Sequence, residues 1–172
     1  MPDHHVRRIV FHKEQEAIVL KTVVRLVSTF FYSGFVPRIP GTAGSAAGLL
    51  FALLTVYDTR VYLSSLAVLL VSAMLVIRRA EILFGRKDSG KIVIDEAVGM
   101  MIALLFLPVE PACIAAAFIF FRLFDILKPF PISMAERAPS PLGVVLDDII
   151  AGIYANITVR VGAALLLKAA CR

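Results

Sequence analysis

The chain has 172 residues, of which 59% are hydrophobic and 18% are charged, whereas an ordinary soluble domain is nearer half apolar and a quarter charged. One domain of this length cannot bury so large an apolar excess in its own core, so the composition predicts that a lipid bilayer covers the rest. The net charge of +5 comes from basic residues scattered between apolar runs. This pattern excludes a basic nucleic-acid-binding face and favours contact with anionic lipid headgroups.

The cysteines and the N-terminal residues exclude two further classes of protein. Cys113 and Cys171 are far apart and lack metal-ligand spacing, which argues against a disulfide framework or a zinc site. Residues 1–16 are polar and lack the apolar core and small-residue cleavage site of a signal peptide. We therefore expect a polar tail over 1–16 that stays in the cytoplasm, followed by a single helical domain over 17–172.

The first predicted element is an amphipathic helix over residues 17–31. Apolar side chains recur there at helical spacing, with Lys21 and Arg25 on another face. Because these two charges fall in the middle of the helix, we expect it to pack on the helical bundle or to lie in the membrane interface rather than to span the bilayer.

Long apolar segments follow and predict a multi-pass, all-α membrane bundle with short membrane helices. Charged residues separate two of them at Asp58–Arg60, and Pro108 and Pro111 divide a third stretch into two short helices. Arg160 interrupts the last segment, where its side chain could extend to the outer interface. The five predicted spans are 39–57, 61–77, 97–108, 112–121 and 149–167.

With the N-terminus inside, 14 of the 18 Lys and Arg residues fall on the cytoplasmic side of these spans. This asymmetry follows the positive-inside rule. The alternative fold is a soluble, all-helical domain with very apolar buried helices, since charge-free runs of this length also occur in large helical cores.

A loop rich in glycine and proline, residues 33–45, opens the first predicted span. Thr42 or Ser45 could cap the following helix. The backbone N–H groups at that helix terminus would suit a phosphate, and Arg38 adds a positive charge. The alternative is a simple turn with a cap.

Two pairs of adjacent acids, Asp95–Glu96 and Asp147–Asp148, stand at the head of apolar segments. Each pair could cap its helix, because negative charge is favourable at a helix N-terminus. Adjacent acids at a membrane boundary also repel each other and lose hydration, and a divalent cation would offset both costs.

A third charged group consists of Arg122, Asp125 and Lys128. Their spacing places Arg122 and Asp125 on one helical face, with Lys128 close by before Pro129 ends the helix. The group is either a ladder of ion pairs or a metal-binding carboxylate between two phosphate-binding cations.

In the predicted topology all these groups lie at cytoplasmic helix ends, where five carboxylates could converge with Arg38, Arg122 and Lys128. An excess of acids favours a hard cation such as Mg²⁺, and the flanking cations would bind a phosphate. The candidate catalytic and metal-binding residues are Asp95, Glu96, Asp125, Asp147 and Asp148.

Other phosphatase chemistries lack their residues in this sequence. All three histidines lie in the N-terminal tail, no cysteine is followed six residues later by arginine, and no Asp-x-Asp pair is present. A Mg²⁺-dependent mechanism with water as nucleophile remains, and attack by one of the carboxylates stays open.

At the same four positions the chain resembles the phosphatidylglycerophosphatase A family. The matching segments are SGFVPRIPGTAGS (33–45), IVIDEAVG (92–99), FRLFDILKPFPI (121–132) and GVVLDDIIAG (143–152). They occur in the family's order and extend over about 120 residues. The resemblance implies an all-helical, Mg²⁺-dependent phosphoric monoester hydrolase that converts phosphatidylglycerophosphate to phosphatidylglycerol, a step of phospholipid synthesis, in the bacterial inner membrane.

Carried over by position, the resemblance makes the five acids metal-site candidates and makes Arg38, Thr42, Arg122 and Lys128 phosphate-site candidates. It implies an anionic phospholipid as substrate and an active site on the cytoplasmic face. The apolar exterior would also permit homo-oligomers.

Two other functions are weighed against this one. Another enzyme of phospholipid synthesis, such as a CDP-alcohol phosphotransferase, would carry an Asp-Gly…Ala-Arg signature that the chain lacks. A small cation-coupled carrier would place ionisable residues near the bilayer midplane, where this sequence has only Arg160.

Overall fold

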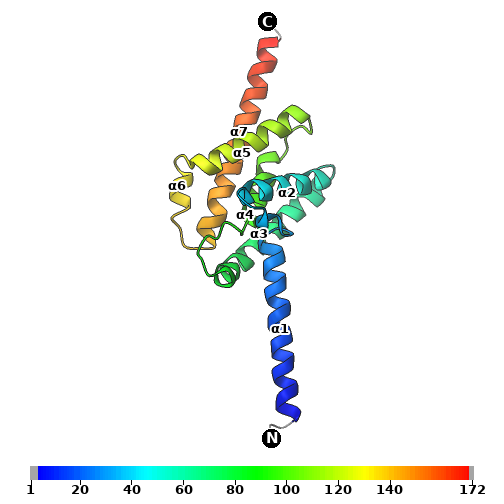
Figure 1. Ribbon diagram of the computed structural model, residues 1–172. Helices are drawn as coiled ribbons and strands as arrows, with labels where there is room; N and C mark the ends of the chain where they lie inside the picture. Colours follow the sequence, from blue (N-terminus) through cyan, green and yellow to red (C-terminus); the bar gives the residue numbers. More distant parts are fainter. Residues whose placement is uncertain (1–3, 171–172) are drawn as a thin grey trace.

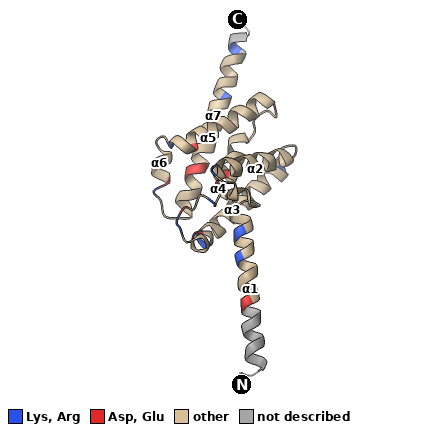
Figure 2. Cartoon of the chain, viewed as in Figure 1, with Lys and Arg blue, Asp and Glu red and all other residues tan. Residues whose placement is uncertain are grey.

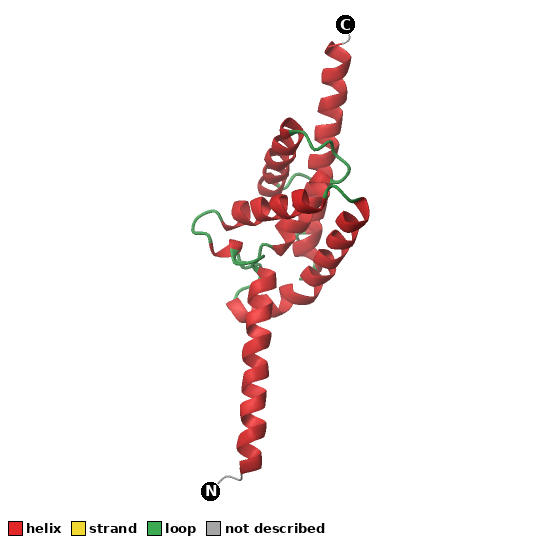
Figure 3. Cartoon of the chain, turned by 90° about the vertical axis from the view of Figure 1, so that its right-hand side faces the viewer, coloured by secondary structure: helices red, strands yellow, loops and turns green. Residues whose placement is uncertain are grey.

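The computed structural model describes residues 4–170, with the side chains of residues 14–166 and 168. All secondary structure in the described range is helical, which confirms the predicted all-α class. The seven α-helices in that range are α1 His4–Ser28, α2 Pro40–Thr55, α3 Thr59–Phe84, α4 Ile94–Leu104, α5 Pro111–Leu127, α6 Ile132–Ala135 and α7 Leu142–Ala170, with a short 3₁₀ turn, η1, at Ser33–Phe35. The helices α1 and α7 extend from the body of the molecule in opposite directions (Figures 1 and 3).

The helix α4 is the centre of the body. Nine of its 11 residues are buried, and it packs mainly against α7 and α2. Its sequence is apolar on nearly every side, as expected of a helix enclosed by others. Eleven residues rise only about 16 Å, roughly half the thickness of a bilayer core, so α4 is too short to cross a membrane.

The helices α4 and α7 cross in close contact at two glycines. A Cβ atom on Gly152 would collide with the carbonyl oxygen of Gly99, and a Cβ atom on Gly99 would lie 2.7 Å from the carbonyl oxygen of Asp148. Both glycines end predicted motifs. Their role is steric: they let the two backbones approach closely.

The predicted breaks between helices are confirmed. Asp58 caps α3 by accepting hydrogen bonds from the N–H groups of Arg60 and Val61. The α4 helix ends at Leu104, and α5 begins with Pro111 in its first turn. The predicted spans 97–108 and 112–121 therefore correspond to two helices that start earlier and differ in length.

The N-terminal helix differs from the prediction. It begins at His4, inside the segment predicted as a polar tail, and it ends at Ser28 rather than at residue 31. Val24 is only 5% exposed, but Leu20 is 54% exposed, so only the last turns of the predicted apolar face pack on the body. Phe31 lies beyond the helix with a positive φ.

Two helices, α3 and residues Leu142–Leu166 of α7, are long and apolar enough to cross a membrane. Only 22% of the most apolar window of each is buried by protein. The core helix of a soluble protein would be mostly buried, so this exposure favours a membrane protein over the soluble alternative.

We expect Gly152→Ala to destabilise the fold by about 1–3 kcal/mol, because the added methyl group cannot be accommodated between α4 and α7. The matched control is Gly162→Ala on the same helix, where a Cβ atom would meet nothing within 4 Å. That change should instead stabilise α7 by about 0.5–1 kcal/mol. Thermal unfolding of the two variants in detergent measures the difference. Equal midpoints would contradict the close helix contact.

Candidate active site

Three carboxylates meet where the first turn of α4 faces α7. One oxygen from each of Asp95, Glu96 and Asp148 lies within 4.8 Å of the others, and we call these three residues the acidic cluster. The capping interpretation is wrong for the second pair: α7 begins at Leu142, so Asp147 and Asp148 lie in its second turn, where both are buried. In α4 the acids do lie in the first turn, but the N-cap residue is Val93.

The acidic cluster contains buried oxygen atoms that no protein group satisfies. Asp95 Oδ1, Glu96 Oε2 and Asp148 Oδ1 are buried without a hydrogen-bond partner among the described residues. Buried polar atoms in folded proteins are normally paired, and an unpaired buried charge is costly. A divalent cation with oxygen ligands would satisfy all three atoms, so the donor set fits Mg²⁺.

The surroundings disfavour the charged forms of the two α4 acids. Burial raises the pKa of Glu96 to about 8, and the charges of Asp148 and Asp125 act in the same direction. Burial, followed by the charge of Glu96, raises the pKa of Asp95 well above its ordinary value. Without a bound cation, protons on these carboxylates neutralise part of the negative charge.

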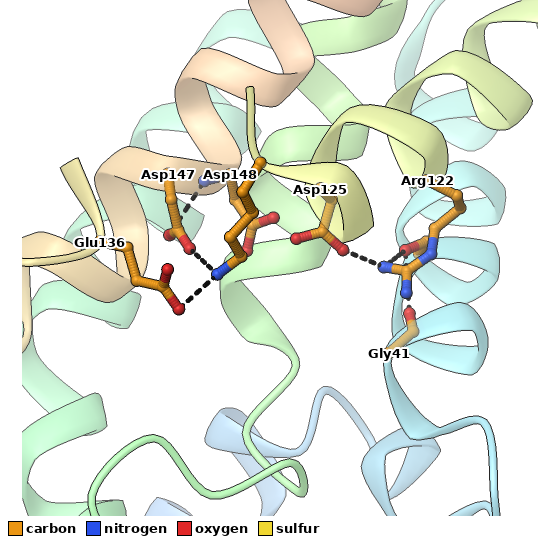
Figure 4. Close-up of polar contacts among 8 residues, drawn as sticks. Gly41, Arg122, Asp125, Glu136, Asp147 and Asp148 are labelled. Atoms are coloured by element: carbon orange, nitrogen blue, oxygen red, sulfur yellow. Dashed lines mark hydrogen bonds and ion pairs between the residues drawn. The ribbon is translucent and has the colours of Figure 1, made fainter. Parts of the chain in front are cut away.

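Beside the acidic cluster, Arg122 and Asp125 form the predicted ion pair. The distance from Arg122 Nη1 to Asp125 Oδ2 is 2.6 Å, and the same nitrogen donates to the Ser45 hydroxyl at 3.2 Å. Asp125 lies between Arg122 and Asp148 in the close-up (Figure 4). Arg122 Nε is buried and has no partner among the described residues, so this cation retains a free donor next to the unpaired acids.

Lys128 does not continue a ladder with Asp125. It ends α5 with a left-handed backbone (φ 45°), which turns its side chain toward α7. Its ammonium nitrogen lies 2.7 Å from Asp147 and 2.7 Å from Glu136. Although burial opposes the charged form, the hydrogen bonds with Asp147 and Glu136 raise the pKa of Lys128. The lysine therefore remains charged and forms an ion pair with each of the two acids.

Glu136 was not predicted as a site residue, because it follows the four-residue helix α6 and shares no helical spacing with the other acids. No pattern in the sequence distinguishes it from a surface residue. The acids thus divide into two groups. Asp125 and Asp147 form ion pairs with Arg122 and Lys128, whereas no ion pair joins the acidic cluster to a basic side chain of the described residues.

The glycine-rich loop brings the N-terminus of α2 to the site. A Cβ atom on Gly41 would lie 2.8 Å from Glu96 Oε1 and 3.1 Å from Arg122 Nη2, so the backbone of α2 lies close to the ends of both side chains. The predicted cap is wrong: Ile39 is the N-cap residue without a side-chain bond, and the Ser45 hydroxyl donates to the carbonyl of Gly41. Ser45 instead supports Arg122.

Two predicted phosphate-site residues are not joined to the cluster by the contacts in the described part of the chain. Arg38 is exposed, with a φ of 70°, and takes part in none of the ion pairs found there. Thr42 is half-buried in the first turn of α2. Their assignment as substrate-binding residues stays a prediction.

The charges of the site do not balance. Counting the five predicted acids as ionised against Arg122 and Lys128 gives 2 − 5 = −3. Acidic positions on α5 and α7 lie in the body of the molecule, whereas the coloured basic positions of α1 lie outside it (Figure 2). The buried excess of negative charge calls for bound cations or protons.

The chain is similar in sequence to a known family of proteins. A family model for phosphatidylglycerophosphatase A matches residues 26–163, which include all four motifs. The chain belongs to the phosphatidylglycerophosphatase A family. This confirms the family inferred from the motifs and, with it, an enzyme of the phosphatase class.

Individual relatives are similar in sequence to this chain over most of their length. The chain is 37% identical over 146 residues to phosphatidylglycerophosphatase A of Haemophilus influenzae, covering 83% of this chain and 90% of the relative. It is 38% identical over 134 residues to phosphatidylglycerophosphatase A of Escherichia coli, covering 74% and 76%. It is also 35% identical over 145 residues to a putative phosphatidylinositol-3-phosphatase of Bacteroides thetaiotaomicron, covering 79% and 91%. No solved structure matches the chain.

The raised pKa of Glu96 predicts how stability depends on pH when divalent cations are removed. Because the folded pKa, about 8, lies above the ordinary value of 4.5, the folded state binds the extra proton. This contribution is complete below the ordinary pKa and is lost as the pH rises through the folded value. The unfolding midpoint in chelator should therefore decrease as the pH rises from about 5 to about 8, and should level off above that range. Glu96→Gln should make the fall shallower, and an unchanged slope in that variant would contradict the assignment.

Proposed function

We propose that the chain is a Mg²⁺-dependent phosphatase that removes the terminal phosphate of phosphatidylglycerophosphate to give phosphatidylglycerol. The observation that carries the proposal is the acidic cluster: three buried, unpaired carboxylate oxygens next to a buried arginine with a free donor, in a chain of this family. Such a site suits a cation and a phosphate together.

Asp95, Glu96 and Asp148 would hold the cation. When bound, the cation supplies charge neutralisation and polarises a phosphoryl oxygen. Asp125 and Asp147 lie beside the cluster and orient the two basic side chains. All five predicted acids thus belong to the proposed site, three as ligands of the cation and two as positioning residues.

The phosphate would be held from the side of α2 and α5. Arg122 offers its unpaired Nε, and its guanidinium plane is fixed by Asp125 and Ser45. The first turn of α2 presents free backbone N–H groups to an anion. Lys128 has three N–H donors, of which Asp147 and Glu136 accept two, so one remains for a phosphate oxygen.

Hydrolysis joins a water oxygen to phosphorus and breaks the bond from phosphorus to the glycerol oxygen. A carboxylate of the site accepts the proton from water, and the leaving glycerol oxygen takes up a proton. The positive charges of Arg122 and Lys128 stabilise the negative charge that spreads over the phosphoryl oxygens in the transition state. Water is our preferred nucleophile, and a carboxylate nucleophile is the alternative.

The proposed location is the bacterial inner membrane, with the site on the cytoplasmic face and α3 and α7 crossing the bilayer. The C-terminal end of α3 and the N-terminal end of α7 are tied together on the side of the site, since Ser140 donates to Glu81 at 2.8 Å. Arg78 and Arg79 lie near that end of α3, which agrees with the positive-inside rule. A lipid headgroup would then meet the site at the interface.

The decisive measurement is phosphate release from phosphatidylglycerophosphate in detergent micelles, with Mg²⁺ and with chelator. We expect release that requires the cation and that falls by at least about 10²-fold in Asp95→Asn, because a ligand of the cation is lost. The matched control is Glu110→Gln, which removes an exposed acid at the head of α5, where it makes no capping bond. This control should retain wild-type rates.

The assay should also include phosphatidylinositol-3-phosphate, because one relative is named for that activity. Faster release from the inositol lipid would replace the proposed substrate. Folded, cation-loaded protein that releases no phosphate from either lipid would refute the phosphatase and favour another step of phospholipid synthesis or a cation carrier.

A further inference from the structure

At the end of α4 opposite the acidic cluster, two side chains of α7 bind the free carbonyl groups. Asn156 Nδ2 donates to the carbonyl oxygens of Ala103 and Leu105, both at 2.9 Å. Arg160 Nη2 donates to Leu105 and Phe106, also at 2.9 Å. The two side chains are joined by a 2.7 Å bond from Arg160 Nε to Asn156 Oδ1. We call Asn156 and Arg160 the α4 clamp.

The clamp binds the groups that a helix end leaves without partners. The last carbonyls of a helix have no intrahelical donor, and a positive charge near them is favourable. After Leu104 the chain leaves the helix, with Phe106 at a positive φ. The exposed Arg160 donates to these carbonyls, and its place at the outer interface stays a prediction.

The clamp shares a face of α7 with the site. Asp148, Gly152, Asn156 and Arg160 are each four residues apart, so they form one row along the helix. The row begins with an acid of the cluster, continues with the glycine that contacts Gly99, and ends with the clamp.

The row of α4 that faces α7 has the same order of residues: Asp95, Gly99 and Ala103 are four residues apart. Asp95 meets Asp148 in the acidic cluster, and Gly99 contacts Gly152 where the helices cross. The carbonyl of Ala103 accepts a hydrogen bond from Asn156. The chain therefore runs in the same direction along both helices. Their relative axial position decides how far Asp95 lies from Asp148.

A glycine contact alone resists sliding weakly, because two smooth surfaces without side chains can move along each other. Directional bonds at the C-terminal end of α4 resist such a shift. Since a cation site requires its ligands in place to within a fraction of an ångström, a small axial shift would spread the ligands.

We propose that Asn156 and Arg160 are positioning residues that set the axial register of α4 on α7 and so keep Asp95 and Glu96 in reach of Asp148 for one cation. The inference rests on the proposed function only in that this cation serves the hydrolysis. If the clamp were only a helix cap, its loss would lower stability and leave the affinity for the cation unchanged.

The test is Asn156→Ala in the purified, full-length protein, titrated with Mn²⁺ as a spectroscopic probe without lipid. We expect the dissociation constant for Mn²⁺ to rise by about tenfold, as for other residues that orient metal ligands. In the lipid assay, kcat should fall while KM at saturating cation stays within about twofold, because the phosphate-binding groups are not moved. Arg160→Lys, which keeps a charge and a donor, should give an intermediate rise and provides a milder variant if Asn156→Ala does not fold.

Two controls separate register from general stability. Tyr62→Phe removes the bond from α3 to the carbonyl of Met101 in the last turn of α4, so it loosens the same end of α4 without removing a contact with α7. Thr158→Ala removes a hydroxyl of α7 that bonds only within its own helix, to Tyr154. Both controls should bind Mn²⁺ as the wild type does.

Unchanged Mn²⁺ affinity in the clamp variants would overturn the inference, and so would an equal loss of affinity in Tyr62→Phe. These outcomes are independent of the proposed function. A wild-type protein that binds Mn²⁺ through the clamped site but releases no lipid phosphate would refute the phosphatase and leave the positioning role intact.

Discussion

The close crossing of α4 and α7 is the constraint on which the rest of the structure depends. Without side chains at Gly99 and Gly152 the two backbones approach until a methyl group has no room between them. This contact allows the first turn of α4 to lie close to the second turn of α7, where Asp95 and Glu96 approach Asp148. Packing of this kind would be unfavourable if the three acids had to remain charged and alone. Positive charge at the acidic cluster therefore stabilises the fold.

The protein itself supplies only part of the positive charge near the acidic cluster. The N-terminus of α2 lies against Glu96 through Gly41, and the acids of α4 lie in that helix's own first turn, so two positive helix ends face the site. The two basic side chains do not neutralise the acidic cluster, because Asp125 and Asp147 already hold them. This division has a chemical consequence. The cations stay fixed and charged for an incoming phosphate, while the unpaired oxygens stay free for a metal ion.

Much of this could be predicted from the sequence, and the reasons are local. Helical spacing gave the Arg122–Asp125 pair, prolines gave the break between α4 and α5, and the absence of suitable histidine and cysteine left the carboxylates as the chemical groups. Three of the five predicted acids, Asp95, Glu96 and Asp148, meet at one point, and their roles stay a prediction.

The failures concern features that depend on where a helix starts or on contacts between distant segments. Asp147 and Asp148 looked like a cap because the apolar run begins after them, but α7 already begins at Leu142. Glu136 reaches Lys128 only because the lysine ends α5 with a left-handed backbone, which no spacing rule reveals. The purpose of Arg160 could not be inferred either, since its partners are backbone carbonyls of another helix.

The shortness of α4 links these observations. A helix of 11 residues has few intrahelical bonds relative to its free ends. Each end of α4 must therefore be completed by other elements, with acids and α2 at one end and the clamp at the other. A longer helix would continue beyond the body and would not need side chains of α7 to end it. Because α7 supplies partners at both ends, it acts as the scaffold on which α4 is held, and α7 itself continues as one of the two apolar helices able to cross a membrane. The element that would anchor the protein in the bilayer is thus the same one that sets the geometry of the site, which places the acidic cluster at a fixed depth relative to the anchor.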